Sequence, residues 1–141
     1  MPTNAEQARA AIENVCAGNV SRAEEFYDPR FHDHVNTMEF HGHEGIAKSV
    51  SLYRRLFSDL SLVDEQVTEG DRVASRWTLH GTNRGRAVRL SGITISRLED
   101  GKIVEDWGST DSVELLRQLG VWRSLLMLVT EWRLLLELAR A

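Results

Sequence analysis

The spacing of apolar residues in the first part of the chain is mainly helical. A short helix is expected over residues 21–27, followed by short strands over residues 31–35 and 38–41. A longer helix fits residues 44–57 and includes Tyr53 and Phe57 on its apolar face. The first helix is predicted from apolar residues at helical spacing ahead of a Gly18-Asn19 stop signal: Ala8, Ala11, Ile12 and Val15.

The second part of the chain alternates apolar and polar residues with the period of a β-strand. Glycine-containing turns at residues 70–71 and 99–101 separate the alternating segments. Strands joined by short turns form an antiparallel sheet, and the preceding helices must cover one of its faces. We therefore predict an α+β fold in which a strongly curved sheet, closed by helices, leaves a cavity. The predicted strands are residues 60–69, 72–82, 86–98 and 103–108.

The chain returns to helical spacing after the last predicted strand. Asp111 followed by Glu114 is a capping pattern, and Gly120 ends the helix that follows. A further amphipathic helix is expected from about residue 122 to residue 140. Its wide apolar face must be buried, either as a lid on the pocket or as the seam of a dimer. That face consists of Leu125, Leu126, Leu128, Val129, Trp132, Leu135, Leu136 and Ala139.

Composition narrows the class of protein. The 141 residues are a common size for one domain, and no repeat or linker divides them, so residues 1–141 are expected to form a single domain. The formal net charge of -4 gives no reason to expect nucleic acid binding. Charged residues interrupt the most apolar region, so no membrane span is expected. A single cysteine, Cys16, and an N-terminus without a signal-peptide pattern favour a cytoplasmic protein.

Six segments carry a resemblance to a known family. In their order and spacing they resemble the SnoaL-like polyketide cyclase (ester cyclase) group of the nuclear transport factor 2-like superfamily. The resemblance implies a cone-shaped fold with a deep pocket for a hydrophobic small molecule, and a homodimer. The segments are DHVN (33–36), HGHEGI (41–46), LFSDLSL (56–62), EGDRVASRWTLHGTNRG (69–85), RLEDGKIVEDW (97–107) and LRQLGV (116–121).

One predicted strand carries a basic residue that the resemblance directs into the pocket. Alternation places Arg76, Thr78 and His80 on one face of this strand and Trp77 on the other. Epoxide hydrolases of the superfamily have a cavity-facing arginine followed two residues later by an acid, a position that Thr78 holds here. Arg76 is expected to face the cavity, either to support catalysis or to neutralise a buried carboxylate. Thr78 and His80 would then contact the ligand.

The last predicted strand lacks the carboxylate of the family's cyclases. That residue lies five positions beyond the Ile of GKI, where this chain has Gly108. Asp106 shares the face of Gly108, and an apolar pocket would raise its pKa and suit it to proton transfer. The alternative is that Asp106 pairs with Arg76 or lies near solvent. Asp111 is a further candidate acid from the W-x-x-x-D pattern of some cyclases, although helix capping already explains it.

Histidines supply another candidate base. His34 falls where the family places a cavity-facing histidine, which would move a proton, bind a carbonyl or satisfy a buried neighbour. His32 and His34 share a strand face, and His41 and His43 have the same spacing, which raises the question of a metal. We expect no metal site, because the sequence shows no third histidine or clustered carboxylate with zinc spacing.

Other residues are expected to line the pocket, and two functions stay open. Tyr53, Phe57 and Trp107 serve as core packing or as ligand contacts, and Thr94 would hydrogen-bond a ligand oxygen. The first function is an acid/base cyclase or isomerase that acts on a hydrophobic carbonyl compound. It would need no cofactor, because the substrate's own carbonyl accepts the charge. The alternative, favoured by Gly108, is a non-catalytic binding protein. An epoxide hydrolase is disfavoured because its expected acids are replaced.

Overall fold

Helices and strands follow one another in nearly the predicted order. The computed structural model describes residues 1–126, 128 and 129, and residues 121–126, 128 and 129 are helical. Half of the apolar face predicted for the last helix lies outside the described residues, namely Trp132, Leu135, Leu136 and Ala139. The elements are α1 (Asn4–Ala17), η1 (Val20–Arg22), α2 (Ala23–Phe26), β1 (Tyr27–Val35), β2 (Met38–His41), α3 (Gly42–Leu56), β3 (Leu60–Glu69), β4 (Arg72–Asn83), β5 (Arg86–Glu99), β6 (Lys102–Thr110) and α4 (Ser112–Leu119).

The strands form a curved six-stranded sheet in the order β2-β1-β6-β5-β4-β3. Strands β3 to β6 pair in antiparallel fashion along the chain, as the short turns predict. Strand β1 pairs with β6 in parallel, which differs from the antiparallel sheet expected from sequence. No hairpin joins these two strands, so turn signals carry no information about their relative direction.

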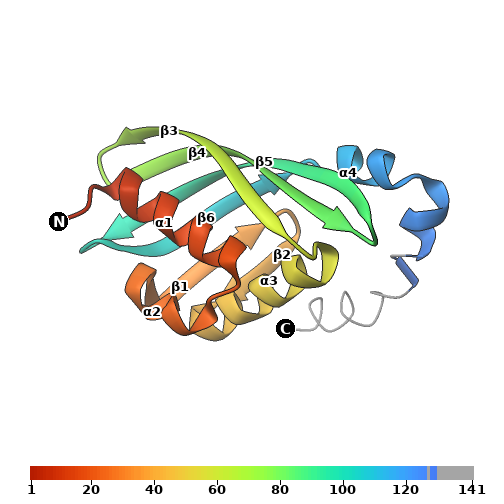
Figure 1. The fold of residues 1–141 in the computed structure, drawn as a ribbon. Helices are drawn as coiled ribbons and strands as arrows, with labels where there is room; N and C mark the ends of the chain where they lie inside the picture. The colour runs from red at the N-terminus through yellow and green to blue at the C-terminus, as the bar shows by residue number, and fades with distance from the viewer. Residues whose placement is uncertain (127, 130–141) are drawn as a thin grey trace.

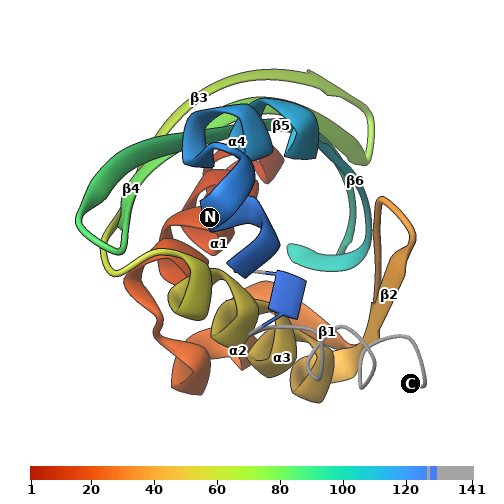
Figure 2. The same cartoon turned by 90° about the vertical axis from the view of Figure 1, so that its right-hand side faces the viewer.

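The sheet arches around the helices and leaves one face of each strand turned inward. In the end view the strands curve over α1, while α2 and α3 lie on the side of β1 (Figure 2). Helix α4 lies at the end of the molecule opposite the N-terminus (Figure 1). This arrangement confirms the α+β, cone-like architecture predicted from the alternation. Within the described part of the chain, no helix has the length and hydropathy needed to cross a membrane.

Local signals explain where the helices begin and end. The Thr3 hydroxyl accepts a hydrogen bond from the Glu6 backbone N–H, and the Glu6 carboxylate accepts one from the Thr3 N–H, so α1 begins with a capping box. Gly18 ends α1 in the left-handed conformation, with φ of 71°, as the stop signal predicts. Asp111 caps α4 through a 2.9 Å hydrogen bond from the Glu114 N–H to its carboxylate.

Candidate active site

A small cavity lies between the inner face of the sheet and helices α1 and α3. Its volume is about 90 Å³, and its lining is mainly apolar side chains from both helices and from β1, β4, β5 and β6. A second hollow of about 240 Å³ adjoins it and shares Val35, Tyr53 and Thr110 with its lining. Leucines of α3 and α4 and Leu128 form much of this second hollow. We call the first the inner cavity and the second the outer groove.

Two carboxyl groups lie together on the wall of the inner cavity. Asp33 of β1 and Asp106 of β6 are direct partners in the parallel pairing, and each is only 9% exposed. Neighbouring strands lie about 4.8 Å apart, so partner side chains on one face are adjacent. The Oδ1 atom of Asp106 is buried and has no hydrogen-bond partner among the described residues. A buried polar atom of this kind is suited to bind a group on a ligand.

Burial sets the protonation of this carboxyl pair. The pKa of Asp106 is raised by burial, and a hydrogen bond from the Ser96 hydroxyl opposes this shift. The pKa of Asp33 is raised by burial and then by the charge of Asp106. Two carboxylates this close repel each other, so the pair holds one proton far more tightly than an isolated aspartate would. The pair therefore offers a protonated and an ionised carboxyl group side by side.

Hydroxyl groups near the pair stay protonated. Tyr27 and Tyr53 both line the inner cavity. Burial, and then the charges of Asp106 and Asp33, raise the pKa of the Tyr27 hydroxyl. Burial, and then the charge of Asp33, raise the pKa of the Tyr53 hydroxyl. Both side chains thus keep an O–H that can donate a hydrogen bond to a ligand oxygen.

One polar contact fixes the opposite wall of the inner cavity. The Trp77 indole N–H donates a 3.0 Å hydrogen bond to the Thr94 hydroxyl oxygen, and both side chains line the cavity. Gly92 is opposite Trp77 in the β4–β5 pairing, and its missing side chain leaves room for the indole ring. Thr94 is thereby held in the wall where the sequence predicts a polar pocket residue.

The inner face of this sheet also carries Gly108, beside Asp106 on β6. A family model for SnoaL-like polyketide cyclases matches residues 5–119. The chain belongs to the SnoaL-like polyketide cyclase family. The expected family and nuclear transport factor 2-like fold are both confirmed. A search among curated proteins gives no match.

Solved structures of this SnoaL-like fold align with most of the chain. IdmH from Streptomyces antibioticus is 24% identical, with a TM-score of 0.76 over 85% of this chain and 100% of its own. A SnoaL-like polyketide cyclase from Agrobacterium tumefaciens is 23% identical, with a TM-score of 0.71 over 85% and 100%. A Catenulispora acidiphila protein with a ketosteroid isomerase-like fold, in complex with trimethylamine, is 15% identical, with a TM-score of 0.73 over 82% and 93%. These likenesses show a shared fold.

The structure of this SnoaL-like chain places three predicted site residues at the inner cavity. Asp106, Thr94 and Tyr53 all line it. Gly108 lines it too, so the position of the family's carboxylate does face the pocket. A Cβ atom at Gly108 would make only ordinary contacts, the nearest at 3.6 Å to Val35. Asp106 therefore lies one inward-facing position before the place where the family's cyclases have their acid.

The prediction that Arg76, Thr78 and His80 of β4 face the cavity is wrong. Arg76 is 70% exposed and pairs with Glu65 of β3 at 2.5 Å on the outer face of the sheet. Thr78 and His80 lie on the same outer face as Arg76 and are absent from the lining of both hollows. The inward residues of β4 include the large apolar Trp77 and Leu79, because burying them removes apolar surface from water. The three outward residues therefore do not contact a ligand in the cavity.

The prediction that His34 faces the cavity is also wrong. Its Nε2 atom lies 3.1 Å from a Glu105 carboxylate oxygen on the outer face of the sheet. Trp107 lies there as well, stacked on the His34 ring with a centroid separation of 5.9 Å. In β1 the inward residues are Phe31, Asp33 and Val35, so the parity of the strand turns His34 outward.

Two further residues that were predicted for the site, Phe57 and Asp111, have structural roles instead. Phe57 is 1% exposed and packs within the hydrophobic core, outside the lining of the inner cavity. Asp111 is exposed and caps α4, which is the structural explanation anticipated from the sequence.

Sequence reasoning missed Asp33. The signal was the pair of apolar neighbours Phe31 and Val35, which place the odd-numbered residues of β1 on the core side. An aspartate between two inward apolar residues must itself point inward. The pairing with Asp106 then brings the two acids together.

Proposed function

We propose that the chain catalyses proton transfer on a hydrophobic, carbonyl-bearing small molecule, leading to ring closure or isomerisation. The observation that carries this proposal is the Asp33–Asp106 pair on the wall of a mainly apolar cavity. Paired titratable groups that share a proton supply a base and an acid at one place. Membership of a cyclase family supports the same class of chemistry.

The carboxyl pair and the tyrosines divide the chemistry between them. The ionised carboxylate takes a proton from the carbon next to the substrate carbonyl, and the C–H electrons move onto the oxygen to give an enolate. The Tyr27 and Tyr53 hydroxyls stabilise that oxygen by donating hydrogen bonds. The enolate carbon then forms a bond to a second carbonyl, or it is reprotonated at a different carbon. The carboxyl pair returns the proton to the product.

The shape of the two hollows supports a hydrophobic substrate. The outer groove is lined by apolar side chains such as Leu52, Leu90 and Leu115 and leads to the residues shared with the inner cavity. An apolar molecule gains about 25 cal/mol for each Å² that leaves water on entering such a site. The carbonyl end would then lie in the inner cavity, and the apolar remainder in the groove.

A non-catalytic binding protein is the second candidate. Gly108 supports it, because this position leaves space where the family's cyclases have an acid. The two candidates differ in one property. A catalyst accelerates exchange of the substrate's acidic C–H, whereas a binding protein only sequesters the molecule.

Deuterium exchange separates these candidates. The probe is 2-tetralone, an apolar ketone with acidic C–H groups, incubated with the protein in D₂O and followed by proton NMR. We expect exchange faster than in buffer alone, and a loss of about 100-fold or more in Asp106→Asn, as is typical when a general base is removed. Asp33→Asn should lose exchange as well. Binding of a fluorescent apolar dye by each variant reports that the pocket is intact.

Glu65→Gln is the matched control for this experiment. It makes the same carboxylate-to-amide change on the exposed outer face, where Glu65 is 71% exposed, so exchange should stay at the native rate. Native exchange in both aspartate variants would contradict the acid/base proposal. Dye binding without any acceleration by the native protein would favour the binding protein.

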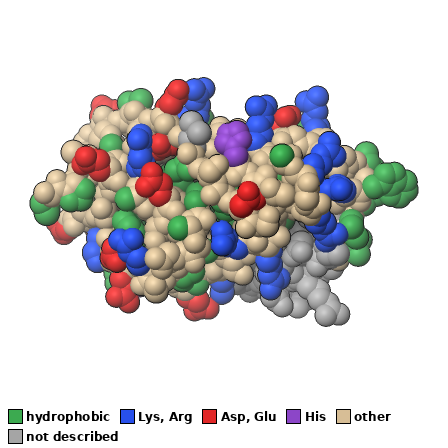
Figure 3. All heavy atoms as spheres, in the orientation of Figure 1, with side chains coloured by type: hydrophobic (Ala, Val, Ile, Leu, Met, Phe, Trp, Pro, Cys, Tyr) green, Lys and Arg blue, Asp and Glu red, His purple; other side chains and the backbone are tan. Residues whose placement is uncertain are grey.

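We also propose that the chain acts as a cytoplasmic homodimer. The buried, unpaired thiol of Cys16 suits a reducing compartment. Exposed apolar side chains gather at the end of the molecule that holds α4 and the residues after it (Figure 3). Trp122 is 85% exposed there, and a large exposed apolar group is typical of a contact surface.

A further inference from the structure

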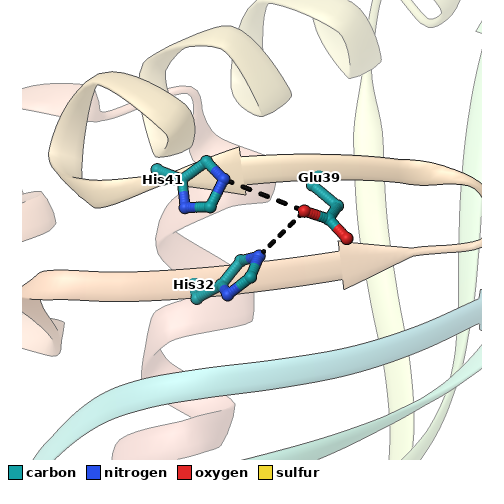
Figure 4. Close-up of side chains that lie close together, drawn as sticks. All are labelled: His32, Glu39 and His41. Atoms are coloured by element: carbon teal, nitrogen blue, oxygen red, sulfur yellow. Dashed lines mark hydrogen bonds and ion pairs between the residues drawn. The ribbon is translucent and has the colours of Figure 1, made fainter. Parts of the chain in front are cut away.

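The outer face of the sheet carries a histidine and glutamate cluster that the proposed reaction does not use. It lies on the edge strand β2 and its neighbour β1, on the face opposite the carboxyl pair. His32 is the partner of His41 in the β1–β2 pairing, and Glu39 lies two residues before His41 on the same face. These three side chains point toward one another from the two strands (Figure 4). We call them the outer triad.

The donor atoms of the outer triad converge. The Oε2 atom of Glu39 lies 3.3 Å from Nε2 of His32 and 3.9 Å from Nε2 of His41. All three donor atoms lie within 4.8 Å of one another. Zinc binds imidazole nitrogen and carboxylate oxygen at about 2.0–2.2 Å, so two ligands of one ion are at most about 4.4 Å apart. Small rotations of exposed side chains are enough to close this geometry.

The imidazole rings of the cluster lie close to one another as well as to Glu39. The ring centroids of His32 and His41 are 4.2 Å apart, and those of His32 and His34 are 3.9 Å apart. Imidazole nitrogens on rings this close present lone pairs that one cation can share. The cluster is therefore suited to hold a metal ion.

We propose that His32, Glu39 and His41 bind a divalent transition-metal ion of the zinc type. Two imidazole nitrogens and one carboxylate favour Zn²⁺, Ni²⁺ or Cu²⁺ over Mg²⁺ and Ca²⁺, which prefer oxygen ligands. Three protein ligands leave at least one coordination position for water or an external ligand. The exposed fractions of Glu39 and His41, 59% and 64%, leave the ion accessible from solvent.

A neighbouring triad competes for the same histidine. His32, His34 and Glu105 also bring their donor atoms within 4.8 Å. Glu105 already accepts a hydrogen bond from the Arg97 guanidinium at 3.3 Å, and this cation would repel a metal ion. In the described part of the chain, by contrast, the partners shown for the Glu39 carboxylate are all histidines. The outer triad is therefore the better site.

This proposal departs from the expectation of no metal. The sequence shows His32 and His41 nine positions apart with no recognisable zinc spacing. The antiparallel pairing makes them direct neighbours and adds Glu39 from the same strand as His41. The site is thus a product of strand pairing rather than of a local motif.

Calorimetric titration of the whole chain with ZnCl₂ tests the outer triad. The protein is first treated with a chelator to remove bound metal, and the chelator is then removed. We expect saturable binding of one ion per chain. His41→Ala and Glu39→Gln should each lower the affinity for Zn²⁺ by about 10–100-fold or more. Losing a residue that merely hydrogen-bonds to a metal ligand already costs about 10–100-fold, and these two residues are the ligands themselves. His41 and Glu39 are exposed, so the folded structure should persist, and circular dichroism checks this. Titration with Co²⁺ adds an absorption band that reports the ligand geometry.

His80→Ala is the matched control, because His80 is an exposed histidine on the outer face of another strand, β4. Its affinity for Zn²⁺ should equal that of the native chain. Native affinity in both His41→Ala and Glu39→Gln would overturn the proposal. So would loss of binding only in His34→Ala and Glu105→Gln, which would place the ion in the neighbouring triad. Equal weakening by His80→Ala would indicate adventitious binding and also overturn it.

Discussion

Asp106 is a buried aspartate in surroundings that disfavour the negative charge of its carboxylate. Its Oδ1 atom is buried without a partner among the described residues, and Asp33 lies beside it. In the unfolded chain an aspartate ionises at a pKa of about 3.9. In the folded protein burial raises that pKa, so the native state retains a proton that the unfolded state has released. The contribution of Asp106 to the free energy of unfolding therefore falls as the pH rises from about 4 toward neutrality.

Asp106→Asn should remove much of this pH dependence. The amide stays neutral at every pH and also relieves Asp33 of a neighbouring charge, so the loss of stability between acidic and neutral pH becomes smaller. Urea unfolding at a series of pH values measures this slope for each protein. Glu65→Gln, on the exposed outer face, should keep the native slope. An unchanged slope in Asp106→Asn would show that the burial of this carboxyl group does not control stability.

At the scale of single elements, two glycines on adjacent strands face the interior with opposite consequences. A Cβ atom at Gly92 of β5 would lie 2.4 Å from the Trp77 ring and 2.7 Å from the Ser109 carbonyl oxygen. A Cβ atom at Gly108 of β6 would meet nothing closer than 3.6 Å. Gly92 therefore makes room for a core aromatic ring, whereas Gly108 leaves part of the cavity empty.

Gly92→Ala and Gly108→Ala form a matched pair of substitutions. The first forces Trp77 to move and should lower the free energy of unfolding by about 1–3 kcal/mol, as overpacking does. The second should be neutral, or should stabilise by about 0.4–1 kcal/mol through the unfolded chain. Chemical denaturation measures both. Equal losses of stability would contradict the difference in space that the structure shows.

The strands and helices themselves could largely be predicted from hydrophobic periodicity and turn signals. The inward faces of β4 and β1 were predicted wrongly because the resemblance to the family was followed instead of the apolar residues on each strand. Trp77 on β4, and Phe31 and Val35 on β1, would have settled both faces correctly. The Asp33–Asp106 contact was beyond sequence reasoning, because it needs a parallel pairing between strands that no turn connects.

At the scale of the whole molecule, the segment after α4 has two different surfaces. Leu128 contributes to the lining of the outer groove, whereas Trp122 projects into solvent. The alternatives of lid and dimer seam therefore need not exclude each other. One side of the segment covers the groove, and the other is available to a second copy of the chain.

Substitutions on these two surfaces should have separate effects. Leu128→Ser should weaken binding of an apolar dye in the groove and leave the sedimentation of the protein unchanged. Trp122→Ser should shift sedimentation from dimer to monomer and leave dye binding unchanged, because the side chain is 85% exposed. A native protein that sediments as a monomer would refute the dimer. Native dye affinity in Leu128→Ser would refute the lid.

The parallel contact between β1 and β6 determines when the Asp33–Asp106 pair forms during folding. Asp33 and Asp106 are 73 positions apart (106 − 33), about half the length of the chain, so this closure is a step of high contact order. Until it occurs, each aspartate is hydrated and ionised at neutral pH. Because burial raises the pKa of both aspartates, this closure must draw a proton from solution. The carboxyl pair therefore acquires its charge state in the same event that completes the architecture.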